Sequence, residues 1–147
     1  MKKIVFYWIG FLMSLSLFSQ NQYNLIPQPQ KITPQNGVFT FKKGMNVSIG
    51  NELFEPAAEL LMRQANNIGG FGLTVSKGNA ANGVSFTLNT SLGKEAYSLR
   101  VSSKKIEIQA STGAGAFYAM QTLLQLMPAS MSGDQKISSQ SRYHTVQ

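Results

Sequence analysis

The sequence contains no cysteine, and its only histidine is His144. The absence of cysteine excludes a disulfide framework, a thiolate nucleophile, a lipid-anchored lipoprotein and a zinc site built on cysteine. One histidine cannot form a metal cluster alone, and a solvated or hydrogen-bonded histidine is the more common case. We therefore expect neither a metal nor a cofactor.

Acidic residues are also scarce, with 6 Asp and Glu against 13 Lys and Arg and a formal net charge of +7. A basic balance raises the question of a nucleic-acid or anionic-glycan partner. Six of the lysines, however, stand beside Gly, Ser or Asn at predicted turns and lack interleaved aromatics, which is typical of solvated turns. They are Lys42, Lys43, Lys77, Lys94, Lys104 and Lys105. We expect no nucleic-acid partner.

The first 20 residues have the pattern of a secretory signal peptide. Lys2 and Lys3 precede an apolar run from Ile4 to Phe18, and a polar segment follows at once. A membrane anchor is the alternative, but the run is shorter than the ~20 residues that a spanning helix needs. We expect residues 1–20 to be removed on export, leaving a periplasmic or extracellular domain with no membrane attachment.

The stretch from Glu95 to Pro128 predicts a β-hairpin followed by a helix. Apolar and polar residues alternate over 97–101 and again over 106–110, which predicts two strands with one buried face. Ser111 or Thr112 can then cap a helix that Pro128 ends. The apolar positions of this helix recur at spacings of three and four; they are Ala116, Phe117, Met120, Leu123, Leu124 and Met127.

The Gly-Ala-Gly-Ala start of this helix, residues 113–116, has two interpretations. One is a dinucleotide fingerprint, in which glycines let backbone N–H groups approach a pyrophosphate. The third glycine of that pattern would fall at position 118, which is Tyr118, and the preceding strands form a hairpin instead of a parallel βαβ unit. The pattern therefore favours the other interpretation, in which small residues let the first helical turn pack closely on the sheet.

The earlier part of the mature chain predicts an extended arm, strands and a second helix. Residues 22–35 include Pro27 and Pro29, which favour an extended arm. The alternating runs 38–41 and 47–49 predict a pair of strands joined by a turn, and 73–75 and 84–88 predict two more. Residues 52–68 predict a helix with a Glu59–Arg63 pair and an apolar face made of Phe54, Ala57, Ala58, Leu61, Ala65 and Ile68.

These elements together predict an α+β domain over residues 21–128. We expect a mixed, mostly antiparallel sheet with two helices packed on one face, the first helix serving as a crossover between strand pairs. Phe54, Leu61, Met120 and Leu124 are expected to join the helices. Residues 129–147 form a Ser-rich linker that ends in a β-like run without a partner strand, which suggests a fragment of a longer protein.

Five segments carry a resemblance to a known family: 25–29 (LIPQP), 37–39 (GVF), 95–99 (EAYSL), 106–110 (IEIQA) and 115–126 (GAFYAMQTLLQL). Together they resemble the N-terminal domain of the β-N-acetylhexosaminidases of glycoside hydrolase family 20, over about Asn24 to Met127. The last segment is the most distinctive. Its one departure is Ala119, where members usually carry glycine, a change between small residues.

The resemblance implies an accessory domain that stands before a (β/α)₈ barrel, and the barrel is absent here. In this family an adjacent Asp-Glu pair acts with the acetamido group of the substrate in a retaining mechanism: Glu is the general acid and Asp orients the acetamide oxygen. The sequence has no Asp-Glu dipeptide, so we assign it no catalytic residue. The resemblance implies that the parent protein is an exported β-N-acetylhexosaminidase. The domain would contact its own barrel and, through it, glycans that end in N-acetylhexosamine.

Two other functions stay open, a free-standing exported glycan-binding module and a nucleotide-binding domain. Glu95 and Glu107 are the nearest candidates for a pair of reacting carboxyl groups, since antiparallel neighbours can approach closely. Glu107 alternates with the apolar Ile106 and Ile108, however, and is expected to point to solvent.

Overall fold

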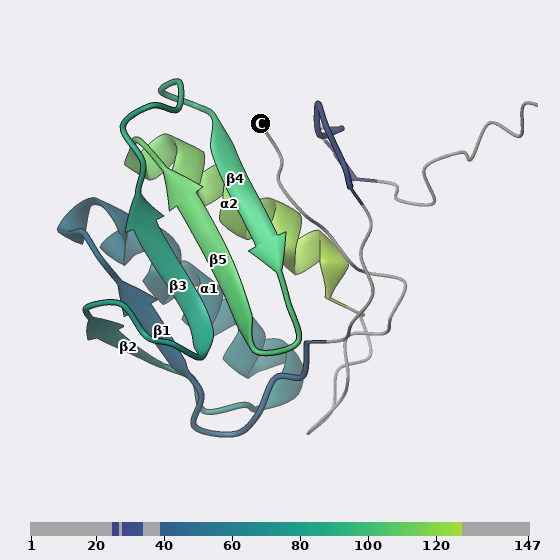
Figure 1. Cartoon of the computed structure of the whole chain (residues 1–147). Coiled ribbons are helices and arrows are strands. Elements are labelled where there is room, and N and C mark those ends of the chain that lie inside the picture. The colour runs from purple at the N-terminus through teal and green to yellow at the C-terminus, as the bar shows by residue number, and fades with distance from the viewer. Residues whose placement is uncertain (1–24, 27, 34–38, 128–147) are drawn as a thin grey trace, which may run out of the picture.

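A computed structural model describes residues 25–26, 28–33 and 39–127. It contains one five-stranded sheet with two α-helices on the same face (Figure 1). The predicted signal peptide, the linker 129–147, Asp134 and His144 lie outside the described residues. The strands are β1 (Asn46–Ile49), β2 (Thr74–Lys77), β3 (Gly83–Leu88), β4 (Tyr97–Val101) and β5 (Lys105–Ala110). The helices are the short 3₁₀ helix η1 (Glu52–Phe54), α1 (Glu55–Gly69) and α2 (Gly113–Leu126).

The sheet order is β2-β1-β3-β5-β4, and the sheet is mixed. β1 pairs in parallel with both β2 and β3, and β3 pairs in parallel with β5. Only β4 and β5 are antiparallel, as the predicted hairpin. The α+β class, the mixed sheet, the α1 crossover and the two helices on one face are therefore confirmed. The expectation of mostly antiparallel pairing is wrong, because α1 returns the chain to the start of β1 before β2 begins.

The predicted pair of strands at 38–41 and 47–49 does not form. Residues 39–41 contain only an isolated bridge at Thr40, and β1 pairs elsewhere. Phe39 and Phe41 are instead buried, and the Phe41 ring lies 5.4 Å from that of Phe71, which follows α1. Burial of two large aromatic rings stabilises this segment more than a short ladder of hydrogen bonds would.

A five-residue loop over 78–82 joins the parallel strands β2 and β3. It crosses in front of β1, on the face opposite the helices (Figure 1). So short a parallel connection is possible because β2 has only four residues. Ser48 of β1 anchors the loop: its hydroxyl oxygen accepts a bond from Ala80 N at 3.1 Å and the hydroxyl donates to Val84 O at 3.2 Å. The loop therefore covers β1 and leaves the β5–β4 part of that face open.

Local signals set the ends of α1. Asn51 caps the 3₁₀ turn that precedes it, since its side-chain oxygen accepts a bond from Leu53 N at 2.9 Å. The helix ends at Gly70, whose φ of 62° is left-handed and whose N–H donates to Asn66 O. Its predicted apolar face is buried apart from Ile68, which is exposed in the last turn.

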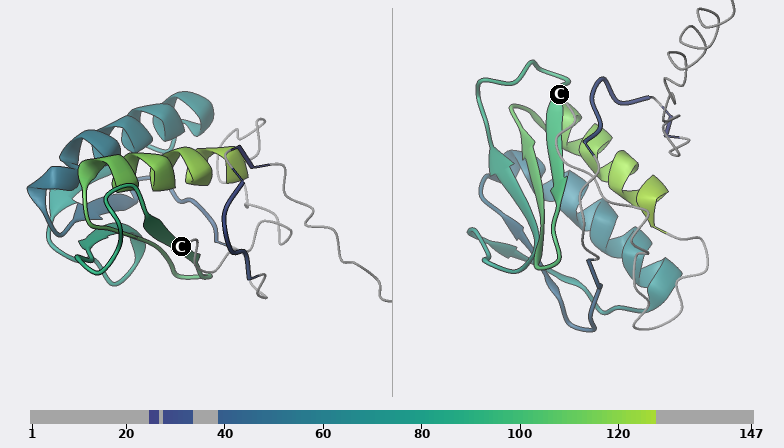
Figure 2. Two further views of the ribbon diagram at one scale, coloured as in Figure 1. Left: turned by 90° about the horizontal axis from the view of Figure 1, so that it is seen from above. Right: turned by 45° about the vertical axis from the view of Figure 1, so that its right-hand side comes forward.

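Thr112 caps α2, because its hydroxyl accepts a bond from Gly115 N at 3.3 Å. The two helices lie side by side and cover the sheet (Figure 2). Phe54, Leu61 and Met120 are fully buried in the core, as expected. Leu124 is only half-buried and Phe117 is exposed, so the buried face of α2 is narrower than the apolar spacing predicted.

Candidate functional site

The glycine-rich start of α2 is a packing device. A Cβ built on Gly115 would lie 2.5 Å from the carbonyl oxygen of Ala96 and 3.2 Å from the Cβ of Ala110. These residues flank β4 and end β5, so the first turn of α2 lies directly on the hairpin. The N–H of Gly115 already bonds the Thr112 cap. This geometry favours the packing interpretation over the dinucleotide fingerprint.

The carboxylates are dispersed and do not form a reacting pair in the described residues. Glu107 lies opposite Arg100 on the antiparallel ladder, and its carboxylate lies 3.6 Å from the ammonium of Lys105. Glu95 is exposed in the turn before β4, five residues from Arg100. Tyr97, the first residue of β4, is already about 10 Å along the strand from Arg100, and Glu95 lies beyond it in the turn. Paired glycosidase carboxyl groups lie within roughly 5–10 Å of each other.

The remaining glutamates of the described residues lie on helix surfaces, and the predicted Glu59–Arg63 pair forms. Glu52 meets Lys77 at 2.6 Å, and Glu59 meets Arg63 at 3.4 Å. The hydrogen bond from Lys77 and then its positive charge lower the pKa of Glu52, and the same contacts raise the pKa of Lys77. Both side chains of this pair are solvent-exposed, so it is a screened surface contact and not an active-site group.

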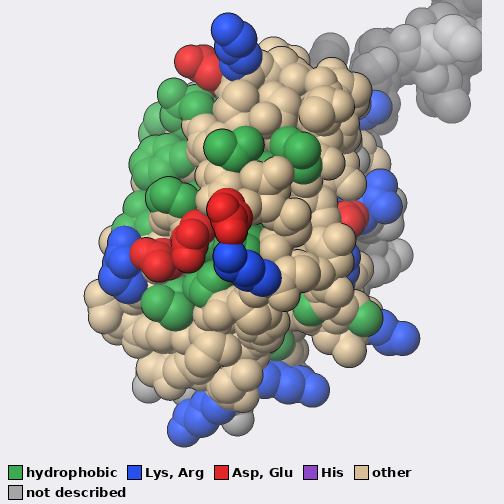
Figure 3. All heavy atoms as spheres, turned by 90° about the vertical axis from the view of Figure 1, so that its left-hand side faces the viewer, with side chains coloured by type: hydrophobic (Ala, Val, Ile, Leu, Met, Phe, Trp, Pro, Cys, Tyr) green, Lys and Arg blue, Asp and Glu red, His purple; other side chains and the backbone are tan. Residues whose placement is uncertain are grey.

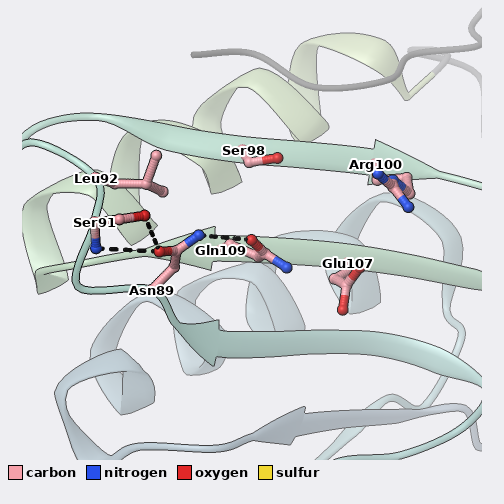
Figure 4. Close-up of a pocket in the computed structure, with 7 residues that line it drawn as sticks. All are labelled: Asn89, Ser91, Leu92, Ser98, Arg100, Glu107 and Gln109. Carbon is pink, nitrogen blue, oxygen red and sulfur yellow. Dashed lines mark hydrogen bonds between the residues drawn. The ribbon is translucent and has the colours of Figure 1, made fainter.

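A hollow of about 220 Å³ lies on the face of the sheet that the helices leave open (Figure 4). It is lined by β4, β5 and the segment that follows β3. The lining is polar apart from Leu92 and consists of Asn89, Ser91, Leu92, Ser98, Arg100, Glu107 and Gln109. Strand register places Ser98 opposite Gln109 and Arg100 opposite Glu107. The alternation of Ser98 with Leu99 and of Gln109 with Ile108 already assigns these polar side chains to one face, but their convergence with Asn89 depends on the sheet order.

A directional chain of hydrogen bonds orders one end of the hollow. Ser91 donates its backbone N–H at 3.1 Å, and its hydroxyl at 2.5 Å, to the side-chain oxygen of Asn89. Asn89 Nδ2 in turn donates to Gln109 Oε1 at 3.0 Å. Because a backbone N–H can only donate, it fixes the orientation of the Asn89 amide and thereby that of Gln109.

The opposite side of the molecule has a different character, because α2 contains no charged residue. Its outward positions include Phe117 and Tyr118, both 39% exposed, with ring centroids 6.1 Å apart. Leu53 of η1 is also exposed. Hydrophobic side chains gather on the side of the molecule where the helices lie (Figure 3). The dipeptide Leu25–Ile26 reaches α2, where Ile26 exchanges two 2.9 Å hydrogen bonds with the Gln125 amide, in agreement with the predicted arm.

Within the described ranges there is no group of three metal-ligating side chains. No helix of the described part is long and apolar enough to cross a membrane. The absence of a catalytic residue, a cofactor and a nucleic-acid partner stays a prediction.

Comparison with known proteins identifies the family. The sequence model of glycosyl hydrolase family 20, domain 2, matches residues 22–141. The chain belongs to this family. It is 29% identical over 118 residues to a β-hexosaminidase of Porphyromonas gingivalis, a match that covers 78% of this chain and 15% of that protein. The resemblance to the N-terminal domain of family 20 hexosaminidases is thereby confirmed.

Solved structures of the family share the fold. A family 20 exo-β-N-acetylglucosaminidase of Vibrio harveyi, solved with N-acetylglucosamine, is 34% identical with a TM-score of 0.62, over 71% of this chain and 16% of its own. A β-hexosaminidase of Streptomyces plicatus, solved as a mutant with its product, has a TM-score of 0.71 at 22% identity, over 83% of this chain and 25% of its own. The chain thus spans between a sixth and a quarter of the length of these relatives.

Proposed function

We propose that this chain is the non-catalytic N-terminal accessory domain of a longer, exported β-N-acetylhexosaminidase. The observation that carries the proposal is the extent of the family match. The domain 2 model matches residues 22–141, while the 118-residue match to the β-hexosaminidase of P. gingivalis covers only 15% of that protein. Most of such an enzyme, including the barrel that the family resemblance implies, therefore has no counterpart in this chain.

The inventory of carboxyl groups supports the non-catalytic part of the proposal. Cleavage of a glycoside needs a proton donor at the leaving oxygen and stabilisation of an oxocarbenium-like centre. The sequence has no Asp-Glu dipeptide, and Glu95 lies in the turn before β4, beyond the end of the ladder that places Glu107 opposite Arg100. The barrel of the longer protein would supply the Asp-Glu pair and remove terminal β-linked N-acetylhexosamine with the help of the acetamido group.

The outer face of α2 is the surface that we propose contacts the barrel. A helix on the surface of an isolated domain normally carries charges on its outer face, as α1 does with Glu59 and Arg63. Over its 14 residues α2 has none, and it exposes Phe117 and Tyr118. Aromatic residues without neighbouring charges are typical of the central part of a protein interface.

Export is proposed from the basic and apolar pattern of residues 1–20. Fusion of these residues to a reporter enzyme that is active only outside the cytoplasm tests this part. The expected result is reporter activity with cleavage near residue 20. Replacement of Leu12 and Leu15 by Asp should abolish it, because both lie in the apolar run. Reporter activity that survives this change would contradict a signal peptide.

The activity is tested with a chromogenic N-acetylglucosaminide on two proteins, the 147-residue chain and the same chain extended through the following reading frame. We expect no turnover by the first and turnover by the second, abolished when the Glu of its Asp-Glu pair is replaced by Gln. Turnover by the short chain that is lost on Glu95→Gln or Glu107→Gln would refute the accessory-domain assignment. An inactive extended protein, or a stop codon after Gln147, would favour a free-standing glycan-binding module.

A further inference from the structure

We propose that the hollow between β4, β5 and the segment after β3 binds a single neutral, hydroxyl-rich sugar ring. This inference does not depend on the enzyme proposed above. The hollow has about 220 Å³, below the roughly 300–1,000 Å³ that is typical of sites for drug-sized ligands. It therefore suits one ring better than an extended chain.

The side chains that line the hollow offer both hydrogen-bond donors and hydrogen-bond acceptors. Gln109 Oε1 is occupied by Asn89 Nδ2, so the geometry leaves the Gln109 Nε2 group as a donor. Arg100 adds guanidinium donors, Glu107 adds carboxylate acceptors, and the Ser98 hydroxyl can do both. A sugar hydroxyl donates one hydrogen bond and accepts up to two. Adjacent hydroxyls of one ring can therefore satisfy donor and acceptor groups at the same time.

The charges of the hollow favour a neutral ligand. Arg100 and Glu107 are opposite each other on adjacent strands, yet the ion pair observed for Glu107 in the described part is with Lys105, at 3.6 Å. The guanidinium and the carboxylate both retain hydrogen-bonding capacity toward the hollow (Figure 4). An anion without protons can accept from Arg100 but cannot donate to the Glu107 carboxylate, whereas a polyol can accept from one and donate to the other.

The site is also partly preorganised. The Ser91–Asn89–Gln109 chain holds two amides in fixed orientations before any ligand arrives. Fixed groups lose little conformational entropy on binding, which favours the interaction. No aromatic side chain lines the hollow, so the stacking that strengthens many ring contacts is missing. We expect a dissociation constant on the order of 1–10 mM, which corresponds to a few hydrogen bonds without a stacked ring.

The experiment is a two-dimensional ¹H–¹⁵N NMR titration of the 147-residue chain with glucose, N-acetylglucosamine and, separately, sodium sulfate. We expect saturable shifts for one or both sugars, confined to amides near Asn89, Ser98, Arg100, Glu107 and Gln109. The variant Arg100→Gln should weaken sugar binding about fivefold or more, because a charged donor is lost. The matched control Arg63→Gln, on the surface of α1, should leave it unchanged.

A second variant tests the orientation of the amides. Asn89→Asp keeps the oxygen that Ser91 needs but replaces the Nδ2 donor with an oxygen. Gln109 must then turn its Nε2 toward residue 89 and present Oε1 to the hollow, so sugar binding should fall about as much as in Arg100→Gln. Shifts that do not saturate, that lie elsewhere, or that are equal in Arg100→Gln and Arg63→Gln would overturn the proposal. Saturation by sulfate alone would identify Arg100 as an anion contact and would equally overturn it.

Discussion

Substitution of Gly115 by Ala tests the contact that places α2 on the hairpin. In an ordinary exposed helix this change stabilises the protein by about 0.5–1 kcal/mol, because alanine has the higher helix propensity. Here the new methyl group would lie 2.5 Å from the backbone oxygen of Ala96 and 3.2 Å from the Cβ of Ala110. The first neighbour is backbone, so it cannot move away by a change of rotamer.

The clash should outweigh the gain in helix propensity. Overpacking of a tight site costs about 1–3 kcal/mol, and subtraction of the propensity term of about 0.5–1 kcal/mol leaves a net loss of up to about 2.5 kcal/mol, centred near 1 kcal/mol. Chemical denaturation monitored by circular dichroism measures this difference in the free energy of unfolding. The midpoint denaturant concentration should fall, while the dependence of the free energy on denaturant concentration should not change. Gly115→Leu should lose more, since its longer side chain meets the same backbone.

Gly93→Ala is the matched control, because Gly93 lies in the segment that approaches α2. A Cβ there would meet only the Cβ of Ala96, at 3.7 Å, an ordinary contact. We expect a change within about 0.5 kcal/mol of zero. If Gly115→Ala were as stable as Gly93→Ala, α2 would not pack on Ala96 as described. Micromolar binding of a dinucleotide that is lost in Gly115→Leu would support the phosphate-binding interpretation instead.

Three further tests, which use five substitutions, address the core and the proposed interface. Leu123→Ala should lower the free energy of unfolding by about 2–5 kcal/mol, because Leu123 is fully buried. Leu124→Ala should lower it by less than half as much. Equal losses of the two variants in denaturant titrations would contradict the orientation of α2. Tyr97→Phe should cost about 1–2 kcal/mol at pH 7, because the buried Thr122 hydroxyl loses its partner at 2.5 Å. Burial raises the pKa of Tyr97, and the bond to Thr122 offsets part of this rise. The native protein should therefore lose stability as the pH rises above about 10, where the unfolded tyrosine ionises first, and Tyr97→Phe should lack this loss in thermal melts. The double substitution Phe117→Ser and Tyr118→Ser should barely change the melting temperature of the 147-residue chain but should lower that of the longer enzyme. An equal fall in the two melting temperatures would place both residues in the domain's own core.

The hairpin and both helices could be predicted from the sequence because their signals are local. Alternation over 97–101 and 106–110, a threonine cap and a terminal glycine each determine structure within a few residues. The partners of β1 could not be predicted, since Asn46–Ile49 pairs with strands that begin about 28 and 37 residues later. The alternating run 38–41 predicted a strand, but the contact of Phe39 with Phe41 and that of Phe41 with Phe71 override this local pattern.

The hollow illustrates a similar limit. Its strand residues, Ser98, Arg100, Glu107 and Gln109, follow the polar positions of a recognisable hairpin. Asn89, in contrast, reaches the hollow only because β3 lies beside β5, and this parallel pairing has no local signal. The alternation of Glu107 with its apolar neighbours predicts that its side chain lies on the open face of the sheet. The strand register, which places Glu107 opposite Arg100, confirms this. The hairpin pattern also allows an approach of Glu95 to Glu107, but Glu95 lies in the turn outside β4, beyond the end of the ladder on which Glu107 faces Arg100.

The two proposed contacts are compatible because they lie on opposite sides of the sheet. The uncharged outer face of α2 points away from the strands, while Arg100, Glu107 and Gln109 lie on the face that the helices do not cover (Figures 1 and 4). A barrel docked on α2 would bury Phe117 and Tyr118 and would leave the hollow facing solvent. Sugar binding at the hollow should therefore have the same affinity in the 147-residue chain and in the longer enzyme. An affinity that fell in the longer enzyme would place the barrel over β4 and β5 instead of over α2.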